Sequence, residues 1–155
     1  MIPRVLFLDS NHPIMISTLR DAGGQCDEDY SSTYEQVLEK IAMYQGVIIR
    51  SRFKLDPRFL DAATHLKVIG RAGAGMENID VNYATSKGIA CVHAPEGNRD
   101  AVAEQAIGML LALMNNLLRA DREVRRGIWK REENRGYELC GNTVGIIGYG
   151  NMGRA

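Results

Sequence analysis

The stretch that decides the fold is "LKVIGRAGAGMENID", residues 66–80. It opens with a short aliphatic run and continues into a glycine-rich turn. An apolar run that is continuous rather than alternating is typical of a strand covered on both faces, as the strands of parallel sheets are. We therefore expect a buried parallel strand whose carboxyl end leads directly into a tight loop.

Further strands of this type lie on either side of that stretch. "RVLFLD" (4–9) and "GVIIRS" (46–51) come before it, "IACVHAP" (89–95) comes after it, and "QCDED" (25–29) is a weaker candidate. The segments between these runs have helical character, with turn-forming residues at their ends. Alternating strands and helices predict an α/β fold in which a parallel sheet has helices on both faces.

Capping residues mark the ends of four short helices. The first begins at residues 12–13, His-Pro, and ends at residues 22–24, Ala-Gly-Gly. Ser-x-x-Glu at 32–35 has the spacing of a capping box for the second helix. Asp-Pro at 56–57 predicts a capping carboxylate and a first-turn proline for the third. "VNYATSKG" (81–88) is the fourth helix, closed by its glycine.

A single long helix is predicted from residue 98 to residue 127. Its first half is apolar on more than one face and its second half is charged, as in helices that are buried between domains or between subunits. Turn-forming residues directly before it predict a domain boundary, which gives domains 1–97 and 98–155. We expect Trp129 and Tyr137 to anchor the polar connector that follows the helix.

Composition narrows the classes of partner. The chain has 19 Lys+Arg and 19 Asp+Glu, so it carries no basic excess for nucleic-acid phosphates or an anionic membrane surface. The most apolar stretch, 106–114, is shorter than the roughly 20 residues of a membrane span. Cys26, Cys91 and Cys140 are an odd number without metal-type spacing, which favours a reducing cytoplasm.

Histidines and metal ligands give no catalytic prediction. His12, His65 and His93 are far apart in the sequence, and none has a carboxylate at a catalytic spacing. We therefore interpret them as surface or packing residues and predict no metal site.

The chain ends on a second glycine-rich loop, "TVGIIGYGNMGRA", residues 143–155. Gly148, Gly150 and Gly153 have the G-x-G-x-x-G spacing of dinucleotide-binding loops, and a predicted strand at 143–150 precedes them. The three glycines allow a tight turn, close approach of a pyrophosphate, and close packing of the next helix. A plain tight turn is the alternative, because the helix and the ribose-binding acid would lie beyond residue 155.

The loop at 73–78 is of a different kind. Asn78 stands where a third glycine would be, so the loop is a poor dinucleotide site. Gly73 and Gly75 favour a nest instead, a run of backbone N–H groups able to hold a carboxylate. The sequence therefore predicts an anion-binding loop directly after the strand.

Two arginines follow neighbouring strands. Arg50, next to Ser51, comes directly after one strand and Arg71 ends another. Ligands of open parallel sheets bind at the carboxyl edge, where Arg suits carboxylate or phosphate groups. The arrangement predicts an anionic substrate. The alternative is that these arginines are ordinary surface charges or pair with Asp56 and Glu77.

Three segments together resemble a known family. They are "GRAGAGMENIDVNYATSKGI" (70–89), "HAPEGNRDAVAEQAIGMLLALM" (93–114) and "RGIWKREENRGYELCGNTVGIIGYGNMGR" (126–154). In order, spacing and content they resemble the D-isomer-specific 2-hydroxyacid dehydrogenases, and most of all the branch that acts on D-3-phosphoglycerate in serine biosynthesis.

The resemblance implies a flavodoxin-like substrate domain, a long interdomain helix that also forms a homodimer, and the start of a Rossmann domain that binds NAD. It implies hydride transfer between the nicotinamide and C2 of a small anionic 2-hydroxy or 2-oxo acid. The implied substrate-binding residues are Arg50, Ser51, Arg71, Gly73, Ala74 and Gly75. The implied cofactor-binding residues are Ala74, Asn98, Val102, Gly148, Gly150, Asn151, Met152 and Gly153.

Some features of the family have no counterpart in this sequence. Asp100 and Ala101 stand where many relatives carry Ser or Thr, so the contact made there is open. The family's catalytic arginine, acid and histidine all follow the Rossmann loop. We therefore expect a truncated chain that is inactive alone, with a segment after Gly127 that is mobile or held by a partner chain.

Several functions remain open. Arg50, Arg52 and Arg71 together favour a phosphorylated acid over a plain one. A hydroxypyruvate or glyoxylate reductase, a D-lactate dehydrogenase and a formate dehydrogenase are alternatives within the architecture. A non-catalytic module that binds an anion or NAD is an alternative outside enzymology.

Overall fold

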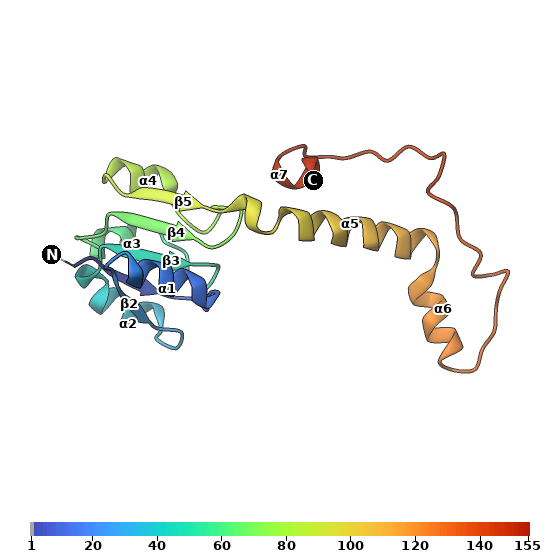
Figure 1. The fold of residues 1–155 in the computed structure, drawn as a ribbon, viewed down its shortest axis with the longest axis horizontal. Helices are drawn as coiled ribbons and strands as arrows, with labels where there is room; N and C mark the ends of the chain where they lie inside the picture. The colour runs from blue at the N-terminus through green and yellow to red at the C-terminus, as the bar shows by residue number, and fades with distance from the viewer. Residues whose placement is uncertain (1) are drawn as a thin grey trace. The chain divides into compact units, whose positions relative to one another are not determined.

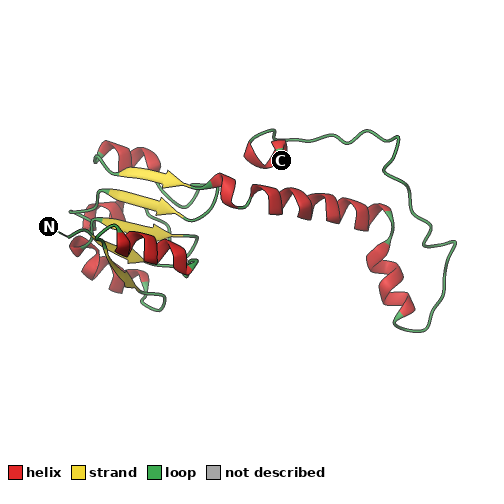
Figure 2. Cartoon of the chain, in the orientation of Figure 1, coloured by secondary structure: helices red, strands yellow, loops and turns green. Residues whose placement is uncertain are grey.

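The computed structural model describes residues 2–155 (Figures 1 and 2). The chain divides into two compact units, Met1–Pro95 and Glu96–Ala155. The first unit holds the sheet, and the second holds two helices, a long connector and the terminal glycine-rich loop.

The first unit is built on one parallel sheet. Its strands lie in the order β2-β1-β3-β4-β5, all parallel. The strands are β1 (Arg4–Phe7), β2 (Gln25–Glu28), β3 (Gly46–Ile49), β4 (Val68–Arg71) and β5 (Ala90–His93). This order is the flavodoxin-like one. It confirms the predicted α/β class and all five strands before residue 96, including the weak candidate at 25–29.

Helices of the first unit begin where their capping residues predict, with one exception. They are α1 (Pro13–Asp21), α2 (Tyr34–Lys40), η1 (Ile41–Met43), α3 (Pro57–Ala62) and α4 (Val81–Ser86). His12 caps α1, and the Asp56 carboxylate caps α3 by accepting from the amide of Phe59 at 3.0 Å. Gly88 follows α4 with a φ of +73°, which suits a glycine.

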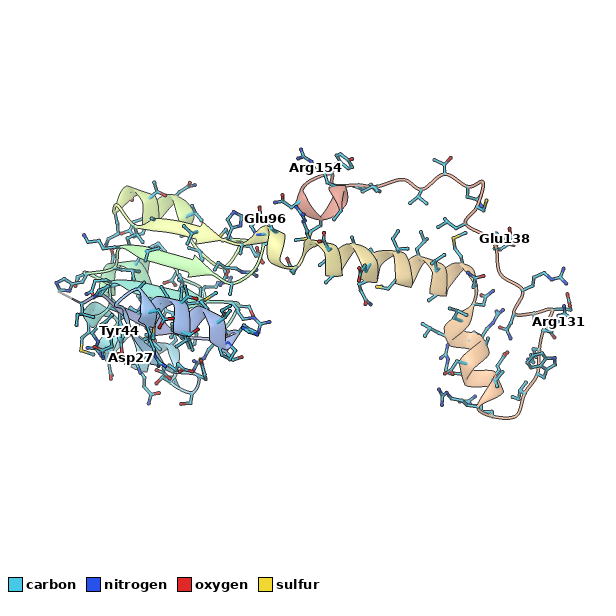
Figure 3. All side chains as sticks on the ribbon, viewed as in Figure 1. Asp27, Tyr44, Glu96, Arg131, Glu138 and Arg154 are labelled. Atoms are coloured by element: carbon cyan, nitrogen blue, oxygen red, sulfur yellow. The ribbon has the colours of Figure 1, made fainter. Side chains whose placement is uncertain are left out.

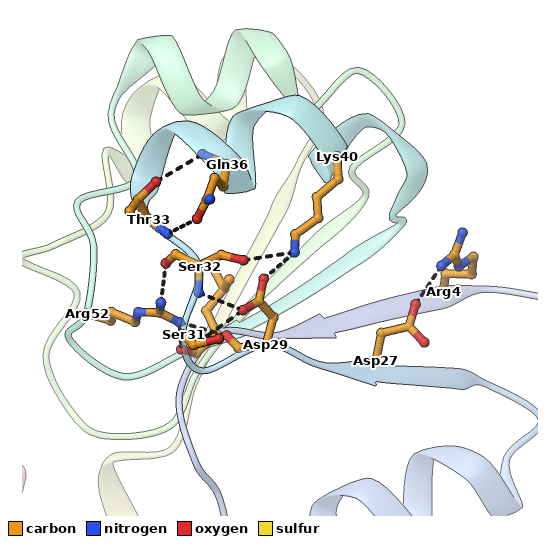
Figure 4. Close-up of polar contacts among 10 residues, drawn as sticks. Arg4, Asp27, Asp29, Ser31, Ser32, Thr33, Gln36, Lys40 and Arg52 are labelled. Atoms are coloured by element: carbon orange, nitrogen blue, oxygen red, sulfur yellow. Dashed lines mark hydrogen bonds and ion pairs between the residues drawn. The ribbon is translucent and has the colours of Figure 1, made fainter.

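The exception is α2, whose predicted capping box lies one residue too early. Thr33 is the N-cap, and its hydroxyl and the Gln36 side chain exchange hydrogen bonds with each other's backbone (Figure 4). The carboxylate of Asp29 accepts from the amides of Ser31 and Ser32 at 3.2 and 2.9 Å. Because this turn fixes Ser32 outside the helix, the cap moves to the next hydroxyl.

Two clusters of buried side chains hold the sheet between its helices. The larger cluster joins one face of the sheet to α2, α3 and α4, with Phe59 and Leu60 fully buried in it. The smaller one joins Phe7, on the other face, to Ile16 of α1. Beside α1 this second face carries an apolar groove of about 540 Å³ whose floor includes Gly70.

The predicted long helix of the second unit is two helices. They are α5 (Arg99–Met114) and α6 (Leu117–Val124), which are bent by 63° from one another. Asn116 between them has a φ of +52°, a left-handed conformation that asparagine tolerates better than most residues. The prediction of one continuous helix was therefore wrong at this residue.

The predicted strand at 143–150 is also wrong. These residues form no strand, and Ile147 is fully exposed. A strand is stable only where neighbours pair its backbone and cover its side chains, and the sheet ends at β5. Trp129 and Tyr137 are 79% and 78% exposed, so the predicted anchoring of the connector by their side chains is not seen among residues 2–155.

Side chains of the second unit project on all sides of α5 and α6 (Figure 3). Neither helix contains a buried residue. No single helix among residues 2–155 is long and apolar enough to cross a membrane, although the bent pair of α5 and α6 passes the same test by length and composition.

Candidate functional site

The sheet brings the two predicted arginines to one edge. Ile49 of β3 pairs with Arg71 of β4, and Arg71 pairs in turn with His93 of β5. Arg50 directly follows Ile49, so it leaves its strand beside Arg71. Both arginines thus lie at the carboxyl ends of neighbouring strands, where open parallel sheets bind ligands.

The Arg71 side chain folds back over its own loop. A Cβ on Gly73 would overlap its Nη1 atom and lie 2.7 Å from Cζ, so the guanidinium lies directly against the Gly73 backbone. The side chain is 16% exposed, and its Nε atom is buried with no hydrogen-bond partner. Arg71 is therefore packed in place, with part of its guanidinium facing outward.

Glu77 is the ion-pair partner of Arg71. Its Oε1 lies 3.7 Å from Nη2 of Arg71. The pairing that the sequence left open is therefore present for Arg71. Arg50 makes no side-chain ion pair or hydrogen bond among residues 2–155, and its side chain is exposed.

The backbone of the 73–75 loop has one amide engaged within the loop and two that are not. Gly73 donates to the carbonyl of Arg71 at 2.9 Å, which makes the turn tight. Across the described chain, the amides of Ala74 and Gly75 donate to no protein acceptor. Two adjacent amides without a partner at the sheet edge can hold an anion.

The loop after β3 is different, because a carboxylate of the protein already fills it. Oδ2 of Asp9 accepts from the amides of Arg50, Ser51 and Arg52 at 2.6, 3.2 and 3.4 Å. The Ser51 amide is therefore engaged, and only its hydroxyl and the Arg50 side chain remain for a ligand. Sequence reasoning missed Asp9, although it follows β1 at the same edge.

Arg52 does not belong to the cationic group that the sequence suggested. Its guanidinium donates to the carbonyls of Leu8, Asp29 and Ser32, with distances of 3.0 and 2.7 Å to the first two. Figure 4 shows the side chain against this turn. Arg52 therefore ties loops together, and two arginines rather than three face the edge.

Two further residues position the loops. Nδ2 of Asn78 donates to the carbonyls of Arg50 and Phe53 at 3.3 and 3.1 Å, which links the loops after β3 and β4. Nδ1 of His93 lies 2.5 Å from the carbonyl oxygen of Ala74. His93 ends β5 at the same edge of the sheet, and this position in the sequence could have identified it as a residue of the site.

In the second unit the terminal loop takes up a turn followed by a helix start. Gly148 has a φ of +92°, and Gly150 is the N-cap of the short α7 (Asn151–Arg154). A Cβ on Gly153 would overlap the carbonyl oxygen of Gly148, so the third glycine is required by close packing. Met152 is half-buried beside it.

The remaining predicted cofactor residues open α5. Asn98 is its N-cap without a side-chain hydrogen bond, and its carbonyl accepts from the amide of Val102 at 3.0 Å. Val102 is 41% exposed. Within residues 2–155 no group of three His, Cys, Asp or Glu side chains could hold a metal ion.

The first unit is a parallel α/β domain, and the carboxyl edge of its sheet carries the arginines and free backbone amides that suit an anion. Residues 5–148 match the family described as D-isomer specific 2-hydroxyacid dehydrogenase, catalytic domain, and the chain belongs to this family. The resemblance seen in the sequence is thereby confirmed.

Similar proteins include several D-3-phosphoglycerate dehydrogenases. The one from Archaeoglobus fulgidus is 40% identical over 138 residues, which are 89% of this chain and 26% of that protein. The chain therefore spans about a quarter of the length of this curated relative.

Solved structures of two relatives have the same fold. The NAD⁺-bound 3-phosphoglycerate dehydrogenase of Entamoeba histolytica has a TM-score of 0.77 and 28% identity, over 99% of this chain and 49% of that one. The NADPH-dependent glyoxylate/hydroxypyruvate reductase of Sinorhizobium meliloti, in complex with NADP and malonate, has a TM-score of 0.78 and 26% identity, over 99% and 48%.

Proposed function

We propose that this chain is the substrate-binding part, and the beginning of the cofactor-binding part, of an NAD-dependent oxidoreductase. The enzyme moves a hydride between the nicotinamide and C2 of a D-2-hydroxy acid. The observation that carries the proposal is the meeting of Arg50, Arg71 and the free amides of Ala74 and Gly75 at one sheet edge. In this proposal, residues 1–97 form the substrate domain and residues 98–155 begin the NAD-binding domain.

The substrate that fits best is D-3-phosphoglycerate, oxidised to 3-phosphohydroxypyruvate in serine biosynthesis. A phosphorylated acid carries a carboxylate and a phosphate. Arg71 and the amides of Ala74 and Gly75 suit the carboxylate, and the exposed Arg50 with the Ser51 hydroxyl suits a second anionic group. The curated relative from Archaeoglobus fulgidus carries the corresponding name.

A reductase of glyoxylate or hydroxypyruvate is the second candidate. Arg52 is engaged with three backbone carbonyls, so the edge offers one cation fewer than the sequence suggested. A substrate with a single carboxylate needs fewer cations. The structural relative from Sinorhizobium meliloti is named for such an activity.

The terminal loop fits a dinucleotide. Gly148 makes the turn, Gly153 admits the carbonyl of Gly148, and the amides of Asn151 and Met152 at the start of α7 would hold the pyrophosphate together with Gly150. Ala74, Asn98 and Val102 complete the proposed NAD-binding set. NAD, when bound, supplies the ring that accepts or donates the hydride.

We also propose that α5 forms a homodimer. It exposes Ile107, Met109 and Leu113, and part of this apolar surface is a groove that Leu118 of α6 also lines. Large exposed apolar patches mark protein contact surfaces. The free cysteines of the chain fit the cytoplasmic location that belongs to this proposal.

The test is NADH oxidation by the complete gene product, with 3-phosphohydroxypyruvate, hydroxypyruvate, glyoxylate and pyruvate compared. We expect the highest kcat/KM with the phosphorylated acid and no turnover by the 155-residue chain alone. Arg71→Met should lower kcat/KM roughly ten- to hundred-fold, because a charged hydrogen bond to the substrate is lost. Arg58→Met, which removes a surface ion pair with Glu35, is the matched control.

Equal turnover of all four acids would contradict the substrate assignment. Turnover by the 155-residue chain, at verified intact mass, would contradict the proposal that it holds only part of the catalytic machinery.

A further inference from the structure

Glu77 places a carboxylate over the loop that we assign to the substrate. A Cβ on Gly75 would overlap Oε2 of Glu77 and lie 2.8 Å from its Cδ, so the carboxylate rests against the Gly75 backbone. The other oxygen, Oε1, lies 3.7 Å from Nη2 of Arg71. One carboxylate of the protein therefore contacts both parts of the proposed anion site, the guanidinium and the glycine loop.

Glu77 differs from Asp9, the other carboxylate at this edge. Asp9 accepts three backbone amides and so belongs to the framework. The Glu77 side chain is 75% exposed, and among residues 2–155 it accepts no hydrogen bond. An exposed ion pair of this kind is weak and readily exchanged for another. Glu77 can therefore leave its position while Asp9 stays.

Arg71 provides the fixed half of the contact. Its side chain is 16% exposed, and its guanidinium packs on Gly73. When Glu77 moves away, the guanidinium keeps its position and the surface over Gly75 is uncovered. An incoming carboxylate then meets the cation and the amides of Ala74 and Gly75 together.

We propose that Glu77 is a built-in competitor that occupies the anion position of the substrate site and is displaced when the substrate binds. This inference rests on the proposed function, because it names the residue that sets anion affinity at that site. A ligand must carry an anion to replace the carboxylate on Arg71, so Glu77 also selects against neutral molecules. It lowers affinity for the anionic substrate, and it favours release because it returns to the loop.

The test measures anion binding directly and without catalysis. The ¹⁵N-labelled 155-residue chain is titrated with sodium malonate at constant ionic strength, and the amide signals of Ala74 and Gly75 are followed. Malonate carries two carboxylates and no oxo group that could be reduced. We expect Glu77→Gln to bind malonate about three-fold more tightly than the unaltered chain, the size of a weak exposed ion pair.

Glu39→Gln makes the same change of net charge at an exposed position of α2 and should bind malonate as the unaltered chain does. Equal or weaker binding by Glu77→Gln would overturn the proposal, since Glu77 would then be neutral or would help to position Arg71. Unmoved Ala74 and Gly75 signals in both proteins would overturn it as well. Failure of hydride transfer in the complete gene product, with tighter malonate binding by Glu77→Gln, would remove the dehydrogenase proposal and leave the competitor intact.

Discussion

The two units of the chain have similar apolar sequences and opposite burial. Every fully buried large aliphatic or aromatic side chain lies at or before Ile89, whereas the most apolar stretch of the sequence, 106–114, contains no buried residue. The first unit closes its core with its own strands and helices. In the second unit, α5 is as apolar as a protein core, but its side chains are not buried. Hydrophobic pattern therefore indicates that a segment is to be buried, but not which chain or domain buries it.

The largest expected effect comes from truncating one large apolar side chain in each unit and comparing the loss of stability. Phe59 is fully buried on α3, and Phe59→Ala should lower the free energy of unfolding of the first unit by about 3–5 kcal/mol. Leu113 is 77% exposed on α5, and Leu113→Ala should change it by less than about 0.5 kcal/mol. Urea unfolding followed by circular dichroism measures both. A cost for Leu113→Ala that approaches the cost for Phe59→Ala would mean that α5 is covered in this chain.

The same difference explains which structural predictions hold. Continuous aliphatic runs predicted β1, β3, β4 and β5, and local caps predicted α1, α3 and α4, because each signal lies within a few residues. β2 has no aliphatic run and was only a weak candidate that would complete the sheet. The run at 143–150 has the same pattern and forms no strand, since strand formation needs neighbours that local pattern does not reveal. The capping box of α2 was placed one residue early because Ser32 and Thr33 both have a suitable partner three residues on.

The sequence predicted at which edge of the sheet the candidate site lies, but not which side chains pair with one another there. Arg50 and Arg71 follow strands that the sequence makes parallel, so their common edge follows from topology. The contacts of Asp9 and Asn78 cross from one loop to another, at sequence separations of 25 to 43 residues. Arg52 has the same charge as Arg50 but donates to backbone carbonyls. Which of the two arginines is engaged in this way depends on the path of the loops, which the sequence does not reveal.

A loss of stability of intermediate size is expected when Asp9, which accepts from the amides of the loop after β3, is removed. Asp9→Ala leaves the amides of Arg50, Ser51 and Arg52 without their acceptor, and it should cost the first unit about 2 kcal/mol. Glu39→Ala on α2 is the control, because it removes an exposed carboxylate that makes no ion pair or hydrogen bond among residues 2–155. Hydrogen exchange should show faster opening of β1 and β3 and no change in α5. Faster exchange of α5 as well would mean that the two units share their stability.

The smallest expected difference between the units is in the dependence of their stability on acid pH. Aspartates with lowered pKa values all belong to the first unit, and they are Asp27, Asp29, Asp56 and Asp61. For Asp29, burial alone would raise the pKa, but the Lys40 ammonium and the amides of Ser32 and Ser31 outweigh burial and hold the pKa far below its usual range (Figure 4).

A carboxyl group whose pKa is lower in the folded than in the unfolded chain stabilises the fold above the unfolded value, here 3.8. That stabilisation is lost as the pH falls through the folded pKa, so the free energy of unfolding of the first unit should decrease below about pH 4. Asp29→Asn should cost about 1 kcal/mol near neutral pH, after allowance for solvent screening. It should also make the acid dependence shallower in urea unfolding at several pH values. An unchanged slope would assign the acid sensitivity to the other aspartates, and helix loss from α5 over the same range would show that the second unit depends on the first for its structure.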